Sequence, residues 1–270
     1  MSTQPDPTSR PDEEHDGTAR MSFFEHLVEL RTRILRALLY IACGVAVGLL
    51  ISDKAYRFLA MPMVKALDDA HVSNKLVYTS PMGPLTLYIT VGIYLGLVLA
   101  LPFVLHQIWL FVAPGLYRHE RRAVASFIGF GTGLFLAGAA FGYYLALPMT
   151  LKFLLSIPGP FTPMISINEY FDMSMIVLAG LGLVFQLPIL IFVLALFGIV
   201  TPRFLWQNFR YAILVIAIVA AAITPTTDAL TMLVFMAPMI VLYLLGIGVA
   251  ALVVRGKRKR AEQLSGAGAA

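Results

Sequence analysis

The sequence FVAPGLYRHERR, residues 111–122, places one glutamate, one histidine and three arginines between two long apolar runs. Residues 76–117 contain no Asp, Glu, Lys or Arg, and residues 123–151 contain none either. A helix needs about 20 apolar residues to cross the hydrocarbon core of a bilayer, which is roughly 30 Å thick, and both runs are long enough. The charged cluster at 111–122 is therefore expected at a membrane surface, between two spans.

The composition also favours a membrane protein. Apolar residues make up 59% of the 270-residue chain and charged residues 13%, whereas soluble domains carry about 25% charged residues. The net charge of +5 is compatible with nucleic-acid binding, but an uneven distribution of basic loops is the better explanation in a membrane chain. The single cysteine, Cys43, excludes an intramolecular disulfide and a thiolate metal cluster.

The apolar segments predict an all-α integral membrane protein, a bundle of six transmembrane helices. The spans are expected at about 34–52, 84–113, 123–147, 170–200, 211–223 and 230–254, and the fifth has only about two thirds of the length of a full crossing. They form one membrane domain, residues 21–254. Residues 1–20 predict a disordered tail and no signal peptide, and residues 255–270 predict a basic and then flexible tail.

Several segments outside the spans have their own patterns. Residues 22–36 combine apolar residues at helical spacing with charged residues on the other faces, which predicts an interfacial helix leading into the first span. Residues 53–77 predict an aqueous loop with a short amphipathic helix, which Pro62 ends or bends. Residues 148–163 are expected to be an outer loop, and residues 201–210 a short loop with an aromatic belt.

The third expected span carries four glycines in a small-xxx-small pattern, Gly129, Gly133, Gly138 and Gly142. In lipid, such a pattern lets two helix backbones approach closely. We therefore expect close packing of this span against another helix, which belongs either to this chain or to a partner.

Basic residues are divided unevenly between the two sides of the membrane. An even number of spans puts both termini on one side, and fifteen of the twenty Lys and Arg residues then share that side. By the positive-inside rule, both termini and the 111–122 cluster are expected in the cytoplasm.

Motifs of catalysis are not found in the sequence. His119 and Glu120 begin like a zinc-protease helix, but Ala123 stands where the second histidine is needed. There is no nucleophile elbow, Walker A loop or dinucleotide-binding motif in the right context, and the other histidines are scattered. We therefore expect a protein that is not an enzyme and that holds no metal or cofactor.

Two glutamates of the expected cytoplasmic side stand beside arginines. Glu29 lies in the 22–36 helix and Glu120 lies in the 111–122 cluster. A carboxylate accepts two parallel hydrogen bonds from a guanidinium, so the two acids could together hold a pair of arginines. The alternative is internal pairing, of Glu29 with Arg33 four residues later and of Glu120 with its own neighbours.

Two polar residues adjoin the apolar spans. Gln186 lies in the fourth span, two residues before Pro188. An unpaired amide is costly in lipid, so Gln186 should point into the bundle, where it either joins two helices or forms a polar site. Asp228 is expected to cap the sixth helix rather than to carry protons.

Two segments of the chain, HLVELRTR at residues 26–33 and QIWLFVAPGLYRHERR at residues 107–122, resemble the signature segments of the TatC family. TatC is the multi-spanning subunit of the twin-arginine protein translocase. The resemblance covers about residues 22–254 and includes the six-span layout, Pro62, FQLP at 185–188 and TPTTD at 224–228. It implies a receptor for twin-arginine signal peptides in the cytoplasmic membrane of a prokaryote, which exports folded proteins by using the proton-motive force.

The resemblance also implies partners and roles for particular residues. The partners would be TatA- and TatB-type single-span subunits, signal peptides, lipid and further copies of the chain, with no nucleic acid. The residues implied in signal-peptide binding are Glu29, Arg31, Phe111, Pro114, Leu116, Tyr117, Glu120 and Arg121. Those implied in structural or partner contacts are Pro62, Gln186, Pro188, Thr224 and Asp228.

The chain departs from the family pattern at two positions. Some members carry a glutamate where this chain has Gln186, and Asp228 is offset by a residue from the family's usual acid. The fifth and sixth spans are interpreted as short, which fits partner helices docking around the fifth. The alternatives are a structural scaffold and a small-molecule transporter, the latter suggested by broken spans and by Gln186, but the charged cluster after the second span has no counterpart after the fifth.

Overall fold

The computed structural model describes residues 23–69, 76–112, 123–157, 164–226 and 228–267. These residues form an all-helical fold, in which the strand-like pairing is an isolated parallel bridge between Val77 and Ser166. The helices in chain order are α1 (Phe23–Leu50), α2 (Ser52–Asp69), α3 (Gly83–Val112), α4 (Ala123–Phe141), the π-helical turn η3 (Gly142–Ala146), α5 (Leu147–Ser156), α6 (Ile167–Val184), α7 (Leu187–Leu196), α8 (Pro202–Gln207), α9 (Phe209–Ile223) and α10 (Ala229–Ala267).

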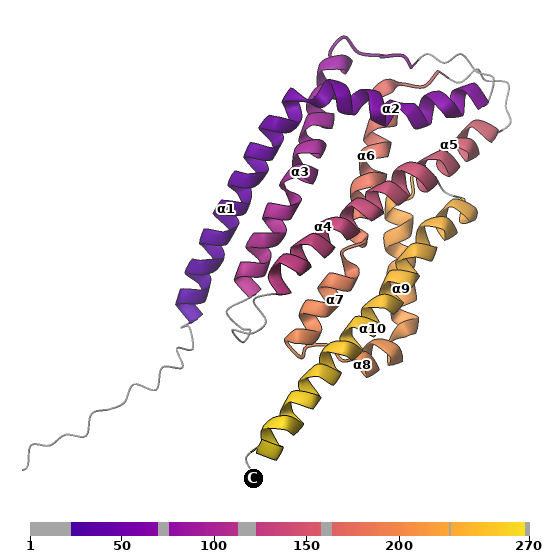
Figure 1. Ribbon diagram of the computed structural model, residues 1–270. Helices are drawn as coiled ribbons and strands as arrows, with labels where there is room; N and C mark the ends of the chain where they lie inside the picture. The colour runs from indigo at the N-terminus through magenta and orange to yellow at the C-terminus, as the bar shows by residue number, and fades with distance from the viewer. Residues whose placement is uncertain (1–22, 70–75, 113–122, 158–163, 227, 268–270) are drawn as a thin grey trace, which may run out of the picture.

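Within the described ranges, five helical segments are long and apolar enough to cross a membrane, and α9 is a shorter apolar helix. A helix of 15 residues, such as α9, is about 22 Å long, which is less than the roughly 30 Å of the hydrocarbon core. The expected short fifth span is thus confirmed. The sixth is not short, because the apolar segment Ala229–Gly256 has 28 residues. In Figure 1, α1 begins and α10 ends at the same end of the bundle.

Helix α1 packs closely along α3 through glycines on both helices. A Cβ atom at Gly48 would lie 2.2 Å from the carbonyl oxygen of Gly92, and one at Gly96 would lie 2.3 Å from the Cα atom of Val45. Because these neighbours are backbone atoms, which cannot move aside as a flexible side chain can, only glycine allows this approach. The outer side of α1 remains uncovered, with Leu39 61% exposed, as expected for a helix that faces lipid.

The third span is longer than the sequence predicted. Helices α4 and α5 join through η3 into one apolar helical segment, and Pro148 lies in the first turn of α5 instead of opening a loop. In η3, the Leu147 N–H donates to the Gly142 carbonyl five residues earlier. This wider turn lets the helix continue through a residue that lacks an N–H donor.

The glycines of the third span divide into two pairs. Gly138 and Gly142 pack against α6, where a Cβ atom at Gly138 would lie 2.6 Å from the Leu181 carbonyl oxygen. Gly129 and Gly133 have no neighbouring atom within 4 Å of such a Cβ. The second pair therefore shows the predicted close packing within this chain.

The fourth span, expected to run to about Val200, is broken near its middle. Helix α6 ends at Val184 and α7 begins at Leu187. Pro188 has no N–H with which to bond the Val184 carbonyl, and the Gln186 N–H instead donates to Leu183, three residues back, at 3.0 Å. The proline thus replaces one helical turn by tighter turns and exposes the Gln186 side chain to the neighbouring helix.

Three further expectations are corrected. The interfacial helix and the first span form one helix, α1, because no helix-breaking residue separates them. The 201–210 segment contains α8, since the Thr201 side chain caps it by accepting a 3.2 Å hydrogen bond from the Phe204 N–H, with Pro202 in the first turn. Helix α10 continues to Ala267, beyond the expected domain end at Val254, because the Lys, Arg, Glu, Gln and Ala residues that follow are strong helix formers.

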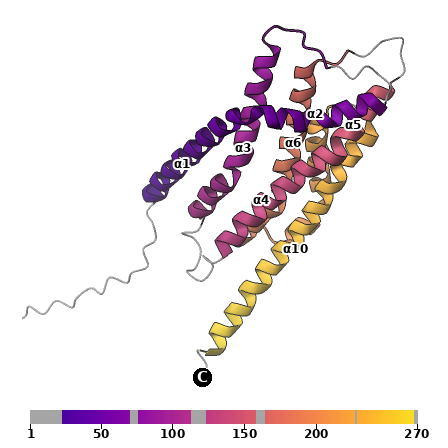
Figure 2. The same ribbon diagram turned by 45° about the horizontal axis from the view of Figure 1, so that its top comes forward.

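Helix α2 lies across the end of the bundle opposite to the start of α1, as Figures 1 and 2 show from two directions. It confirms the expected amphipathic helix, but it runs through Pro62 without ending there. Its inner face packs on α3, α5 and α6 in a cluster of buried side chains. The cluster consists of Ala60, Met63, Ala66, Leu67, Leu87, Val91, Leu151, Tyr170, Phe171 and Met175.

Candidate functional site

Glu29 lies in the second turn of α1 and forms an ion pair with Arg33. The Glu29 Oε1 atom accepts a 3.0 Å hydrogen bond from the Arg33 guanidinium, and the Glu29 side chain is 17% exposed. The internal pairing weighed from the sequence is therefore present for Glu29. The second oxygen, Oε2, is buried and has no hydrogen-bond partner among the residues that the structure describes. A carboxylate can accept several hydrogen bonds, so Glu29 keeps an unused acceptor beside a charged neighbour.

The other residues implied in signal-peptide binding are described only in part. Arg31 is exposed on α1, and Phe111 is half-buried near the end of α3. Outside the described residues lie Pro114, Leu116, Tyr117, Glu120 and Arg121. The flanking residues Val112 and Ala123 end α3 and begin α4 at the same end of the bundle as the first turns of α1 (Figure 1).

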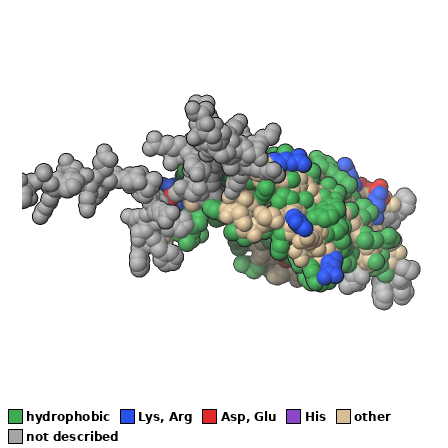
Figure 3. Space-filling view, turned by 90° about the horizontal axis from the view of Figure 1, so that it is seen from below, with side chains coloured by type: hydrophobic (Ala, Val, Ile, Leu, Met, Phe, Trp, Pro, Cys, Tyr) green, Lys and Arg blue, Asp and Glu red, His purple; other side chains and the backbone are tan. Residues whose placement is uncertain are grey.

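Arginine is the prevailing charged residue at this end. Figure 3, viewed from this end, shows separate Lys and Arg side chains on a largely apolar surface. The arginines on the elements that reach this end and whose side chains are described are Arg31, Arg33, Arg36, Arg203, Arg210 and Arg255. Glu29 is the one acidic side chain described among them. A free carboxylate oxygen in such surroundings is a specific place for a visiting cation, because the rest of the surface repels it.

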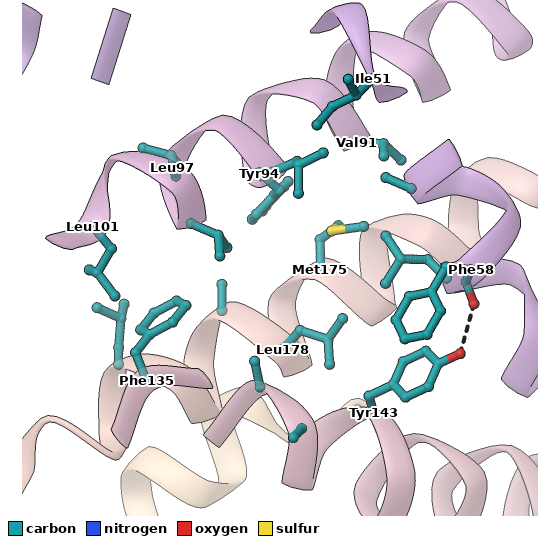
Figure 4. A pocket seen from close by; sticks show the side chains of 18 of the residues that line it. Ile51, Phe58, Val91, Tyr94, Leu97, Leu101, Phe135, Tyr143, Met175 and Leu178 are labelled. Carbon is teal, nitrogen blue, oxygen red and sulfur yellow. Dashed lines mark hydrogen bonds between the residues drawn. The ribbon is translucent and has the colours of Figure 1, made fainter. Parts of the chain in front are cut away.

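Pro62 lies inside α2, and the structure shows how its missing hydrogen bond is replaced. In an α-helix the N–H of residue 62 would bond the Phe58 carbonyl, but proline has no N–H. The Tyr143 hydroxyl, from η3, donates a 2.7 Å hydrogen bond to that carbonyl instead (Figure 4). The Tyr170 hydroxyl, from α6, donates to the next carbonyl, that of Leu59, also at 2.7 Å.

These two tyrosines were missed by the sequence analysis. A proline inside a helix signals that a carbonyl four residues earlier needs a donor, but the sequence does not say which residue supplies it. Tyr143 also stacks on the Phe58 ring, with the ring centroids 4.4 Å apart. The proline, the π-turn and α6 thus form one connected arrangement that fixes α2 on the end of the bundle.

Gln186 points into the bundle, as expected, and joins two spans. Its side-chain amide donates a 2.9 Å hydrogen bond to the Gly131 carbonyl of α4, from the break between α6 and α7. Pro188 is buried in the first turn of α7. Gln186 thus links α4 to the break between α6 and α7. Its side-chain oxygen is buried and has no hydrogen-bond partner within the described part of the chain.

Thr224 and Asp228 stabilise the turn between α9 and α10. The Thr224 hydroxyl donates to the Ala220 carbonyl at 2.7 Å at the end of α9. Asp228 caps α10, because its carboxylate accepts a 2.6 Å hydrogen bond from the Thr231 N–H three residues later. Desolvation acts to raise the pKa of Asp228, but polar interactions with Thr226 and Thr231 outweigh it and hold the pKa below its usual value.

A cavity of about 910 Å³ lies between α1, α2, α3, η3, α4 and α6 and is partly open at the side of the bundle. Figure 4 shows Val91, Tyr94 and Leu97 of α3 facing Met175 and Leu178 of α6 across it. The lining is almost entirely apolar, and Lys54 is the charged residue on it. Among the described residues, no group of three His, Cys, Asp or Glu side chains is placed to hold a metal ion.

Comparisons with known proteins give one consistent result. Residues 25–238 match the family model described as Sec-independent protein translocase protein (TatC). A Sec-independent protein translocase protein TatC from Koribacter versatilis is 48% identical over 258 residues, which cover 95% of each chain. The TatC of Deinococcus radiodurans is 37% identical over 85% of each chain, and the TatCy of Bacillus subtilis is 33% identical over 92% of this chain and 94% of its own.

The fold is also similar to that of a solved structure. A crystal structure described as the twin arginine translocase receptor TatC superimposes with a TM-score of 0.74 at 31% sequence identity. The match covers 85% of this chain and all of the other one.

Proposed function

The chain belongs to the TatC family and is a multi-pass bacterial membrane component of the Sec-independent protein translocase, and on this premise we propose that it is the receptor for twin-arginine signal peptides. Glu29 and Glu120 bind the two guanidinium groups, with Phe111, Pro114, Leu116, Tyr117, Arg31 and Arg121 shaping the same site. The observation that carries this proposal is the buried Glu29 Oε2, which has an acceptor capacity that nothing in the described chain uses.

The chemistry of the site favours arginine over lysine. A guanidinium presents a planar fork of N–H donors that bonds both oxygens of a carboxylate, whereas an ammonium acts as a compact point charge. Arg33 already occupies one Glu29 oxygen, so binding of a signal-peptide arginine requires Arg33 to share or leave that carboxylate. Glu29 keeps a guanidinium partner before and after this exchange, so its charge is paired in both states.

We further propose that both termini and the Glu29 end of the bundle face the cytoplasm. The excess of arginines at this end supports this orientation. A test uses the Cys43→Ser protein with a new cysteine at Lys65 or at His119, exposed in intact cells to a membrane-impermeant maleimide. We expect labelling at position 65 and none at position 119. The reverse pattern would exclude a cytoplasmic receptor site.

The partners in this proposal are TatA- and TatB-type single-span subunits and further copies of this chain, assembled on residues 21–254. The short helix α9 provides a place where a partner helix meets a thinned bilayer. The energy source is the proton-motive force, in which each charge that crosses the field contributes about 2.3 kcal/mol per 100 mV. The protein itself catalyses no reaction. The apolar lining of the cavity gives no support to the alternative of a transporter for small polar solutes.

Site-directed crosslinking tests the receptor role. A photo-reactive residue at Thr32, one helical turn after Glu29, is exposed and should capture a twin-arginine signal peptide in membranes. We expect Glu120→Gln to reduce this capture about tenfold or more, because it removes a charge-assisted pair, and to stop export of a folded reporter. Glu169→Gln, at the opposite end, is the control. Equal capture of a twin-lysine peptide, or normal export by the Glu120 variant, would refute the role.

A further inference from the structure

We propose that the cavity beneath α2 is a specific binding site for one membrane phospholipid, whose phosphate group pairs with Lys54 and whose acyl chains fill the cavity. The cavity belongs to this chain alone, since its lining comes from α1, α2, α3, η3, α4 and α6. Glu29 is not among the residues that line it, and its rim at Lys54 belongs to α2, at the end of the bundle opposite to the start of α1, so it is distinct from the proposed signal-peptide site.

The lining of the cavity matches hydrocarbon. Leucine, valine, isoleucine, alanine and aromatic side chains form nearly all of it, and Figure 4 shows them pointing inward from facing helices. Three tyrosines line it, Tyr94, Tyr143 and Tyr144, and the Tyr143 hydroxyl is already bonded to the Phe58 carbonyl. A polar ligand would therefore leave its own polar groups without partners, whereas acyl chains would not.

The shape of the cavity favours acyl chains over a protein helix. The cavity of about 910 Å³ is bounded by six helical elements, α1, α2, α3, η3, α4 and α6. Flexible chains can follow the irregular walls between α3 and α6, which a rigid helix cannot.

Lys54 supplies the positive charge that favours one bound phospholipid over the surrounding lipid. It lies in the first turn of α2, exposed at the rim of the cavity. Its neighbour Arg57 is paired with Asp53 at 3.3 Å, whereas Lys54 forms no ion pair in the described part of the chain. Because α2 lies across the end of the bundle, Lys54 in its first turn would stand at headgroup depth in a membrane, whereas the cavity residues of α3 and α6 belong to segments that are long and apolar enough to cross the hydrocarbon. A basic side chain above an apolar cavity between helices is the arrangement that recognises a phosphate headgroup.

Native mass spectrometry of the full-length protein tests the proposal. The purified protein is stripped of lipid in detergent and then given phosphatidylglycerol or a diacylglycerol with the same acyl chains. We expect one phosphatidylglycerol to bind and to be preferred over the diacylglycerol. Lys54→Gln should weaken this binding about fivefold, as expected for the loss of one cation near headgroup depth. Lys65→Gln, which changes an exposed lysine of the same helix away from the cavity, should not.

A second variant fills the cavity from within. Ala139→Phe places a ring in the space that Ala139 lines, and it should abolish binding of phosphatidylglycerol while the protein stays monodisperse in gel filtration. Equal retention of the diacylglycerol, equal behaviour of the Lys54 and Lys65 variants, or retention of the phospholipid by the Ala139 variant would overturn the proposal. Displacement of the bound phospholipid by a twin-arginine signal peptide would assign the cavity to the peptide and would overturn it as well.

Discussion

The two ends of the bundle are held in different ways. At the α2 end, two tyrosine hydroxyls donate to consecutive α2 carbonyls, and the Val77–Ser166 bridge ties the adjoining segments together. At the opposite end, the first described turns of α1 have exposed apolar side chains, with Val28 65% exposed, and the Glu29–Arg33 pair is the ion pair described there.

This difference indicates that the polar groups of the α2 end serve stability, whereas Glu29 at the α1 end serves binding. At the α2 end, the carbonyl that Pro62 leaves without an intrahelical donor has a partner, which is what stability requires of buried polar atoms. At the α1 end, the Glu29 Oε2 atom is buried and unbonded, which lowers stability slightly and leaves an acceptor for a ligand. We therefore expect substitutions at the α2 end to change stability, and substitutions at Glu29 to change binding.

The largest effect is expected where α1, which reaches both ends, crosses α3. In Gly96→Ala, the new Cβ atom would meet backbone atoms of Val45 and Gly44 at 2.3–2.7 Å. We expect a loss of about 3 kcal/mol or more in unfolding free energy, because neither backbone can move aside. Gly133→Ala, whose Cβ atom meets nothing within 4 Å, is the control. Thermal unfolding in detergent measures both, and similar melting temperatures would contradict the observed α1–α3 packing.

A smaller effect is expected from Tyr170→Phe at the α2 end. The residue is 2% exposed, and the substitution leaves the Leu59 carbonyl without the tyrosine donor. A buried polar group that loses its partner costs about 1–3 kcal/mol. Tyr144→Phe, at a tyrosine that is 66% exposed, should cost less than about 0.5 kcal/mol. Equal unfolding temperatures of the two variants would show that the α2 end does not depend on this hydrogen bond.

A double-mutant cycle tests whether the Tyr143 hydroxyl replaces the hydrogen bond that Pro62 cannot donate to the Phe58 carbonyl. In Pro62→Ala, the new N–H can bond the Phe58 carbonyl within the helix, so the Tyr143 hydroxyl is no longer its only donor. Tyr143→Phe should then be less destabilising by about 1 kcal/mol in the Pro62→Ala protein than in the unchanged one. Additive effects in chemical denaturation would mean that Tyr143 does not act through this carbonyl.

The spans were predictable from the sequence, and their connections were not. Hydropathy placed five segments that are long enough to cross a membrane and a short α9, because lipid imposes a simple length rule. The tyrosine bonds at α2 join residues 85 and 111 positions apart, and no local pattern predicts which distant hydroxyl meets which carbonyl. The π-turn before Pro148 was missed for a related reason, since a proline reads as a helix end unless the preceding turn widens.

For the candidate site, the sequence predicted the competing interactions at Glu29 and could not choose between them. An i,i+4 spacing is visible in the sequence and predicts the Arg33 pair, which the structure contains. The unused Oε2 atom depends on how α1 is covered by other segments, which the spacing does not reveal. The cap at Asp228 was predicted because an N-cap is a local feature.

The smallest effect on stability is expected at Glu29, where the effect on binding should be large. Glu29→Gln keeps an oxygen acceptor for Arg33 and removes only the charge, so unfolding free energy should change by about 1 kcal/mol or less. Capture of a twin-arginine peptide should nevertheless fall about tenfold, since the guanidinium loses its carboxylate partner.

Asp53→Asn provides a matched control, because Asp53 forms the same i,i+4 pair with Arg57 at the α2 end, at 3.3 Å. It should change neither unfolding nor capture. If both substitutions reduced capture equally, the peptide would be responding to overall charge and not to a site. If Glu29→Gln instead destabilised the protein by more than Tyr170→Phe, the carboxylate would be a structural group, and the distinction between the two ends would not hold.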